Sequence, residues 1–168
     1  TINSEDCELA HKKKFRAGKI YKVHGVGVEL DKFKAVDADE KARLRAEYGY
    51  DGDTFIMIYP ADLAVGKNQQ MLFDVIQKIA KKNEKVKLLL PGQPIMLEKY
   101  KMMVSERGIA DKVDFLGYRR DINNLVGLSD LSVTSSVREG LPINIIEAMA
   151  MGNAIVATDV RGNNDAVE

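Results

Sequence analysis

The chain has 168 residues, of which 45% are hydrophobic and 30% charged, and its formal net charge at pH 7 is zero. This balance is typical of a folded domain with a real core, and it excludes the basic footprint of a nucleic-acid-binding protein. No apolar run approaches the roughly 18 residues that a membrane-spanning helix needs. The single cysteine, Cys7, excludes an internal disulfide and fits a reducing, cytoplasmic compartment, and two distant histidines do not make a zinc site.

The first third of the chain predicts separate elements. Ser4 is placed to cap a first helix, and Asp37 and Glu40 have the spacing of a capping box at the start of a second. Two glycines, Gly25 and Gly27, indicate a hinge between these two helices. In chain order we expect a helix over residues 4–16, a strand over 20–23, a hinge over 24–28, a helix over 37–48 and a turn over 49–53.

From Thr54 onward, short apolar runs alternate with helical segments. This alternation predicts an α/β fold, a Rossmann-like doubly wound parallel sheet with right-handed crossovers. We expect strands over residues 55–59, 86–90, 113–116, 131–134 and 154–157, and helices over 68–82, 95–107, 122–128 and 142–151. The chain stops six residues after Gly162 with no closing helix, so we expect a domain truncated at its C-terminus.

Ligands of such sheets bind beyond the carboxyl ends of the strands. The stretch from Glu139 to Glu147 lies there and places two carboxylates eight positions apart, one in a loop and one in the following helix. Pro142 is expected at the first helical position. Free backbone N–H groups and the positive end of the helix dipole favour a phosphate at such a helix start. The pattern therefore outlines a nucleotide-sugar site.

These acids also have a plainer interpretation. Ile143, Ile146 and Ala150 form the expected inward stripe of the helix, which puts Glu147 on or beside the buried face. A carboxylate there is costly without a partner, and a structural ion pair would explain it as well as a ligand would. Glu139 alone could simply be a solvated loop residue.

Lys67 follows Gly66 after the first expected strand, but the pattern is no P-loop. Asn68 replaces the required Ser or Thr, and Ala61 stands where the leading glycine belongs. A lysine at a helix start opposes the dipole. A negatively charged ligand would explain Lys67, and an exposed lysine is the alternative.

The segments Glu139–Pro142 and Glu147–Thr158 resemble the retaining glycosyltransferases of family 4, the glycosyl transferases group 1. The hallmark of that family is two glutamates separated by seven residues, followed by Glu-Ala-x-Ala-x-Gly and a strand. Val113–Ile122 is similar to the family's strand and loop near the nucleobase, Gly66–Gln69 to its lysine segment and Val26–Phe33 to its interdomain linker. The resemblance covers nearly the whole chain.

The resemblance implies the C-terminal half of a GT-B fold. Residues 1–23 would be a remnant of the N-terminal acceptor domain, 24–53 the interdomain linker with the helix that follows it, and 54–168 an incomplete donor-binding domain. The implied reaction moves a hexosyl group from a nucleoside-diphosphate sugar to a saccharide or lipid-linked acceptor in surface polysaccharide or capsule biosynthesis. No metal or other cofactor and no nucleic acid is implied, and the full-length protein is expected in the cytoplasm, peripheral to the inner face of the membrane.

The same resemblance assigns roles to single residues. Glu139 and Lys67 are expected to be catalytic, Glu139 on hydroxyl groups of the donor sugar and Lys67 on the diphosphate. Glu147 would hold the ribose. The other expected donor-binding residues are Gly140, Leu141, Pro142 and Ile143 at the diphosphate, Tyr118 and Arg119 beside the base, and Gly92 in the loop after the second strand. Having no N–H group, Pro142 can only shape the cradle.

One position departs from the family pattern. The family usually has an arginine five positions before its lysine, and here Asp62 stands at that place. The diphosphate clamp is then weaker, or Arg138 or Arg161 supplies the second charge. Two other functions stay open: another GT-B nucleotide-sugar enzyme of epimerase or phosphorylase type, and a non-catalytic relic of a nucleotide-binding domain. The sequence does not select the sugar, base, acceptor or oligomeric state.

Overall fold

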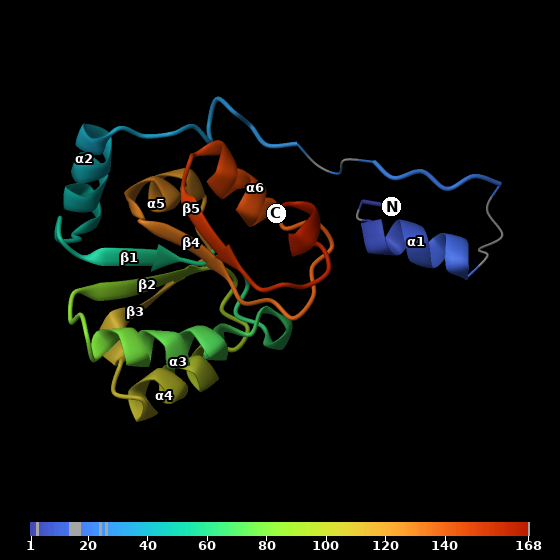
Figure 1. The fold of residues 1–168 in the computed structure, drawn as a ribbon. Coiled ribbons are helices and arrows are strands. Elements are labelled where there is room, and N and C mark those ends of the chain that lie inside the picture. Colours follow the sequence, from blue (N-terminus) through green and yellow to red (C-terminus); the bar gives the residue numbers. More distant parts are fainter. Residues whose placement is uncertain (3, 14–17, 24, 26, 168) are drawn as a thin grey trace.

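The computed structural model describes residues 1–2, 4–13, 18–23, 25 and 27–167. Its centre is a five-stranded parallel sheet in the order β3-β2-β1-β4-β5 (Figure 1). The strands are β1 (Phe55–Ile58), β2 (Val86–Pro91), β3 (Val113–Gly117), β4 (Leu131–Thr134) and β5 (Ala154–Ala157). The helices are α1 (Ser4–Lys12), α2 (Ala38–Tyr48), α3 (Gln69–Ala80), α4 (Leu97–Glu106), α5 (Ile122–Leu128) and α6 (Ile143–Ala150). The predicted doubly wound α/β fold is confirmed.

Helices cover both faces of the sheet, α3 and α4 on one side and α2, α5 and α6 on the other (Figure 1). Side chains alternate along β1, so Ile56 and Ile58 join the apolar cluster of α2 and α5, while Met57 and Tyr59 join that of α3 and α4. All four side chains are at most 3% exposed. Because both faces are buried, the strand is apolar throughout, which made it readable in the sequence.

The strand order decides which loops meet. β1 pairs in parallel with β4, with Met57 opposite Leu131 and Ile58 opposite Ser132. The carboxyl ends of β1 and β4 therefore lie side by side, although about 75 residues separate them in sequence. This is the point where the strand order reverses, and ligands of such sheets bind at that edge.

The N-terminal expectations are only partly confirmed. Asp37 caps α2 by accepting a hydrogen bond from the backbone N–H of Glu40 at 2.8 Å. The strand predicted over Ile20–Val23 is wrong: these residues bond Thr1 but pair with no strand, and Tyr21 and Val23 are 65% and 52% exposed. A β-prone run without a sheet edge to join stays irregular. The helix predicted over 4–16 ends at Lys12; residues 14–16 and two residues of the predicted hinge, 24 and 26, lie outside the described residues.

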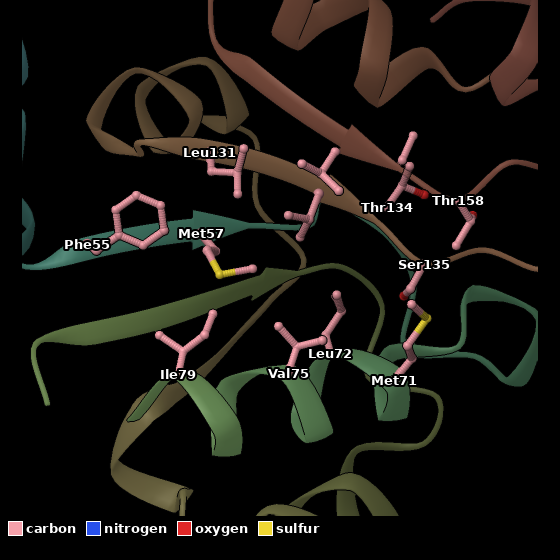
Figure 2. A pocket seen from close by; sticks show the side chains of 13 residues that line it. Phe55, Met57, Met71, Leu72, Val75, Ile79, Leu131, Thr134, Ser135 and Thr158 are labelled. Atoms are coloured by element: carbon pink, nitrogen blue, oxygen red, sulfur yellow. The ribbon is translucent and has the colours of Figure 1, made fainter. Parts of the chain in front are cut away.

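A pocket of about 280 Å³ lies between α3 and one face of β1, β4 and β5. Figure 2 shows Leu72, Val75 and Ile79 of α3 pointing toward the strands, with Met57 on the opposite wall. Val156 on β5 is 59% exposed, so α3 leaves part of this apolar face uncovered. Met71, Ser135 and Thr158 line the end of the pocket nearest the carboxyl edge of the sheet.

Candidate functional site

The structure brings Lys67 and Glu139 into direct contact at the carboxyl edge of the sheet. Lys67 ends the short 3₁₀ helix Val65–Lys67 after β1, and its Nζ lies 2.5 Å from Oε1 of Glu139 in the loop after β4. The same Oε1 accepts a hydrogen bond from Oγ of Ser136 at 2.5 Å. The side chains of Lys67 and Glu139 are 33% and 12% exposed. Both expected catalytic residues thus share one partly open site, but as an ion pair that the sequence did not predict.

Gly162 packs closely against the backbone of the loop that contains Glu139. The backbone N–H of Glu139 donates to the carbonyl oxygen of Arg161 at 3.0 Å. Gly162 has a φ of +88°, and a Cβ added to it would lie 2.6 Å from the carbonyl oxygen of Glu139 and 2.9 Å from that of Gly140. Only glycine fits this approach. The sequence analysis gave Gly162 no role, although a glycine that follows the last predicted strand was the available signal.

The start of α6 lies next to this contact. Pro142 is buried and precedes the helix with a ψ of 86°, so it is the N-cap residue and not the first helical residue as predicted. Among the described residues no side chain caps the helix. The first backbone N–H groups, those of Ile143 and Asn144, have no acceptor within the helix by its geometry. They form a short positive end beside Glu139.

The predicted inward face of α6 is wrong. Ile143 is 44% exposed, whereas Ile145, Ala148 and Met151 are at most 7% exposed. The buried positions recur at helical spacing, but the helix is rotated relative to the prediction because Ile145 and Ala148 meet the sheet. The side chain of Ile143 therefore faces outward at the helix start.

Glu147 lies one turn further along α6, half-buried and with no hydrogen-bond or ion-pair partner among the described residues. Burial raises the pKa of this carboxyl above its usual 4.5, and the charge of Lys32 in the linker opposes the rise. The structural ion pair that could have explained a buried glutamate is absent from the described part of the chain. A half-buried acid without a partner is a candidate ligand-binding group.

We expect Glu147→Gln to stabilise the fold at pH 7 and to lower the affinity for any ligand whose ribose binds this carboxylate. A raised pKa in the folded state means that the charged carboxylate destabilises the fold, an effect absent below pH 4.5 and present once the pH exceeds the raised pKa. Melting temperatures at about pH 4 and about pH 7 measure it, with the exposed Glu84→Gln as control. A lower melting temperature of Glu147→Gln at pH 7 would show that the attraction to Lys32 outweighs burial.

The loop after β3 contains the residues expected beside the base. Tyr118 is 64% exposed, but the guanidinium of Arg119 binds both oxygens of Asp121 at 2.5 and 2.8 Å. It also lies over the ring of Tyr48, 5.8 Å from its centroid. Arg119 and Tyr48 hold the pKa of Asp121 well below its usual range. Arg119 therefore shapes this loop from within, and Tyr118 is the residue whose ring is open to a ligand.

Gly92 and Asp62 join two neighbouring loops of the same edge. A Cβ on Gly92 would lie 2.0 Å from the carbonyl oxygen of Ala61, so the loops after β1 and β2 touch through this glycine. Oδ1 of Asp62 accepts a hydrogen bond from the backbone N–H of Gln93 at 2.9 Å. Asp62, which stands where the resemblance implies an arginine, thus fixes the loop that leads to Lys67.

The two arginines considered as a second cation differ in their surroundings. Arg161 binds Oδ2 of Asp6 in α1 at 2.6 Å, and its side chain is 18% exposed. Arg138 is exposed, adjoins Glu139, and has no ion pair within the described residues. Of the two, Arg138 is the one available to a diphosphate.

The N-terminal segment also lies against this loop. A Cβ on Gly25 would lie 2.3 Å from Cδ2 of Leu141, and one on Gly140 would lie 3.7 Å from Cδ1 of Ile2. Asp165 accepts hydrogen bonds from the backbone N–H of Ser4 at 3.1 Å and from its hydroxyl group at 2.5 Å. Ser4, predicted to be a cap, is instead the first helical residue, and Asp165 supplies the capping oxygen.

Across the residues that the structure describes, no three His, Cys, Asp or Glu side chains gather in a way that could hold a metal ion. None of the helices in the same residues is both long and apolar enough to cross a membrane.

Comparison with known proteins identifies the family. The sequence profile described as Glycosyl transferases group 1 matches residues 40–168. This chain belongs to the glycosyl transferases group 1. EpsD of Bacillus subtilis (strain 168), which is assigned as a glycosyltransferase, is 36% identical over 167 residues, 99% of this chain and 44% of EpsD. The UDP-Gal:alpha-D-GlcNAc-diphosphoundecaprenol alpha-1,3-galactosyltransferase of Escherichia coli is 25% identical over 99% of this chain and 44% of its own length.

Solved glycosyltransferase structures share the fold of this chain. HepE of Anabaena, in complex with UDP and glucose, superposes with a TM-score of 0.84 at 25% identity, over 99% of this chain and 46% of HepE. The fold is therefore that of the Rossmann-like C-terminal half of a GT-B glycosyltransferase. The chain spans less than half the length of the relatives named here.

Proposed function

We propose that this chain is the donor-binding part of a retaining glycosyltransferase of family 4. It transfers a sugar from a nucleoside-diphosphate sugar to a saccharide or lipid-linked acceptor in surface polysaccharide biosynthesis, in the cytoplasm and at the membrane's inner face. The observation that supports it most is the contact between Lys67 and Glu139 beside the start of α6, which no described side chain caps. Glu147 lies one turn along that helix without a hydrogen-bond partner among the described residues. The complex of HepE with UDP-glucose and the lipid-linked acceptor in the E. coli relative's name agree with it.

In the proposed reaction, the site acts mainly by stabilising the negative charge of the leaving group. As the sugar–phosphate bond breaks, negative charge develops on the departing diphosphate, and Lys67 with the N–H groups at Ile143 and Asn144 offsets it. The exposed Arg138 adds the second cation that Asp62 does not supply. The proposal includes no metal. Gly140, Leu141 and Pro142 shape the cradle, and Gly92 keeps the adjoining loop close.

The two glutamates and the loop after β3 would hold the rest of the donor. Glu147 accepts hydrogen bonds from the ribose, and because no described residue hydrogen-bonds to its carboxylate, both oxygens can serve that purpose. Glu139 accepts hydrogen bonds from hydroxyl groups of the sugar. Tyr118 flanks the base, on a loop held in shape by Arg119. The acceptor binds outside this chain's donor site, so acceptor choice is not a property of these residues.

Isothermal titration calorimetry with UDP-, GDP-, ADP- and dTDP-sugars tests the proposal on the intact protein. We expect one class to bind, and Glu147→Gln to raise its dissociation constant by about tenfold, because a hydrogen-bonded charged group is lost. Affinity should also fall as the pH drops through the raised pKa of Glu147, since only the carboxylate accepts from both ribose hydroxyls. Absence of binding by every nucleotide sugar would favour the relic domain, and binding without transfer to any acceptor would favour another GT-B enzyme.

A further inference from the structure

A chain of buried hydroxyl groups runs from the core of the sheet to the carboxylate of Glu139. Tyr59 directly follows β1 and is entirely buried, yet its hydroxyl oxygen lies 2.5 Å from Oγ of Ser136. Thr134 Oγ1 lies 3.2 Å from the same phenolic oxygen. Ser136 in turn donates to Oε1 of Glu139 at 2.5 Å. Thr134 and Ser136 are 4% and 0% exposed, so water does not replace these contacts.

The direction of each hydrogen bond in this series of hydroxyl groups is fixed. A carboxylate can only accept, so the single hydroxyl proton of Ser136 points to Glu139. Tyr59 must then donate to Ser136, and Thr134 to Tyr59. Burial raises the pKa of the Tyr59 phenol, so it keeps the proton that it donates. Each proton points toward Glu139, and aligned hydrogen bonds of this kind strengthen one another.

The contacts are made by one carboxylate oxygen only. Oε1 of Glu139 receives both Ser136 and Lys67. No donor within the described ranges bonds to Oε2, while 12% of the side chain stays exposed. A carboxylate anchored at one oxygen has its other oxygen fixed in direction, and a catalytic or binding group needs such support to act.

We propose that Tyr59 is a positioning residue that acts through Ser136 to fix Glu139, so that Oε2 meets a hydroxyl group of the sugar in a nucleotide-sugar donor. This rests on the proposed function. Tyr59 itself touches no ligand, because it lies beneath the site and is fully buried. Its effect should therefore appear in recognition of the sugar and not in recognition of the nucleotide, which Lys67 and Glu147 hold.

The test compares Tyr59→Phe with wild type in the intact protein, using calorimetry with UDP and with UDP-glucose, and with GDP and GDP-mannose as a second pair. Phenylalanine removes one oxygen and keeps the buried ring. We expect the dissociation constant of the nucleotide sugar to rise about tenfold, while that of the free nucleotide changes by less than about twofold. Ser136→Ala should act in the same direction and at least as strongly. Tyr50→Phe is the matched control, because its hydroxyl group binds Asp114 at 3.0 Å near the start of β3, at the opposite edge of the sheet.

The outcomes separate this inference from the proposed function. If wild type binds neither pair, the proposed function fails for these donors. Suppose that wild type binds a nucleotide sugar and that Tyr59→Phe leaves the ratio of the two dissociation constants, for the nucleotide sugar and the free nucleotide, unchanged. Then only the positioning role of Tyr59 is contradicted. An equal rise in both dissociation constants together with a lower melting temperature contradicts it too, since that is a structural effect. Should Tyr59→Phe fail to fold, Thr134→Val gives the same comparison, with a smaller loss expected in the same direction.

Discussion

Replacing Lys67 with methionine should lower turnover of the nucleotide sugar by about 100- to 1000-fold, the usual loss when one group that stabilises developing negative charge is removed. Methionine keeps much of the lysine's apolar stem and deletes the charge. Nζ of Lys67 lies 2.5 Å from Oε1 of Glu139, and Lys67 ends the loop at the start of α3. Turnover is followed as release of the nucleoside diphosphate, and calorimetry with the free diphosphate gives the accompanying loss of affinity.

The loss could also arise because Glu139, only 12% exposed, is left without its ion-pair partner. The double variant Lys67→Met with Glu139→Gln removes both charges and distinguishes the two causes. If diphosphate affinity returns in the double variant, Lys67 acts mainly on Glu139. Lys87→Met is the matched control, because Lys87 pairs with Asp114 at 2.9 Å with similar exposure near the start of β2, at the opposite edge of the sheet. It should change stability but not diphosphate affinity.

The second large effect is expected from Gly162→Ala, which should lower turnover by about 100-fold, the scale of a displacement near 1 Å at a reacting centre. The added Cβ would lie 2.6 Å from the carbonyl oxygen of Glu139 and 2.7 Å from its carbonyl carbon. Backbone atoms cannot turn aside as a side chain can, so the loop that contains Glu139 must shift. The fold should also lose about 2 kcal/mol of stability, because a non-glycine residue is strained at positive φ.

Gly108→Ala is the control that separates displacement from backbone strain. Gly108 has a φ of +66°, but a Cβ added there meets nothing within 4 Å. It lies after α4, where its backbone N–H donates to the carbonyl oxygen of Ser105. The control should lose about 1 kcal/mol of stability and no activity. Equal activity losses in both variants would contradict the role given to Gly162. Thermal unfolding and turnover of both proteins provide the comparison.

Local pattern in the sequence predicted much of the fold. The bounds of α5, β4 and β5 agree with the prediction residue for residue. These elements are short segments bounded by turn signals, and the two strands are largely apolar, so local sequence defines them. The prediction failed at Ile20–Val23, because a strand needs a neighbouring sheet edge that local sequence does not reveal. It also failed for the buried face of α6, because helical spacing sets the separation of buried residues but not which face meets the sheet.

By itself the sequence determined that the chain has two acids eight positions apart, at a loop and a helix that follow a buried strand, and a lysine after another strand. Only the tertiary structure decided that Lys67 and Glu139 touch, that Tyr59 reaches Ser136, and that Gly162 lies behind the loop of Glu139. These contacts join residues between 23 (Gly162 and Glu139) and 77 (Tyr59 and Ser136) positions apart. They follow from the strand order, which makes β4 the neighbour of both β1 and β5, and strand order depends on packing across the whole sheet.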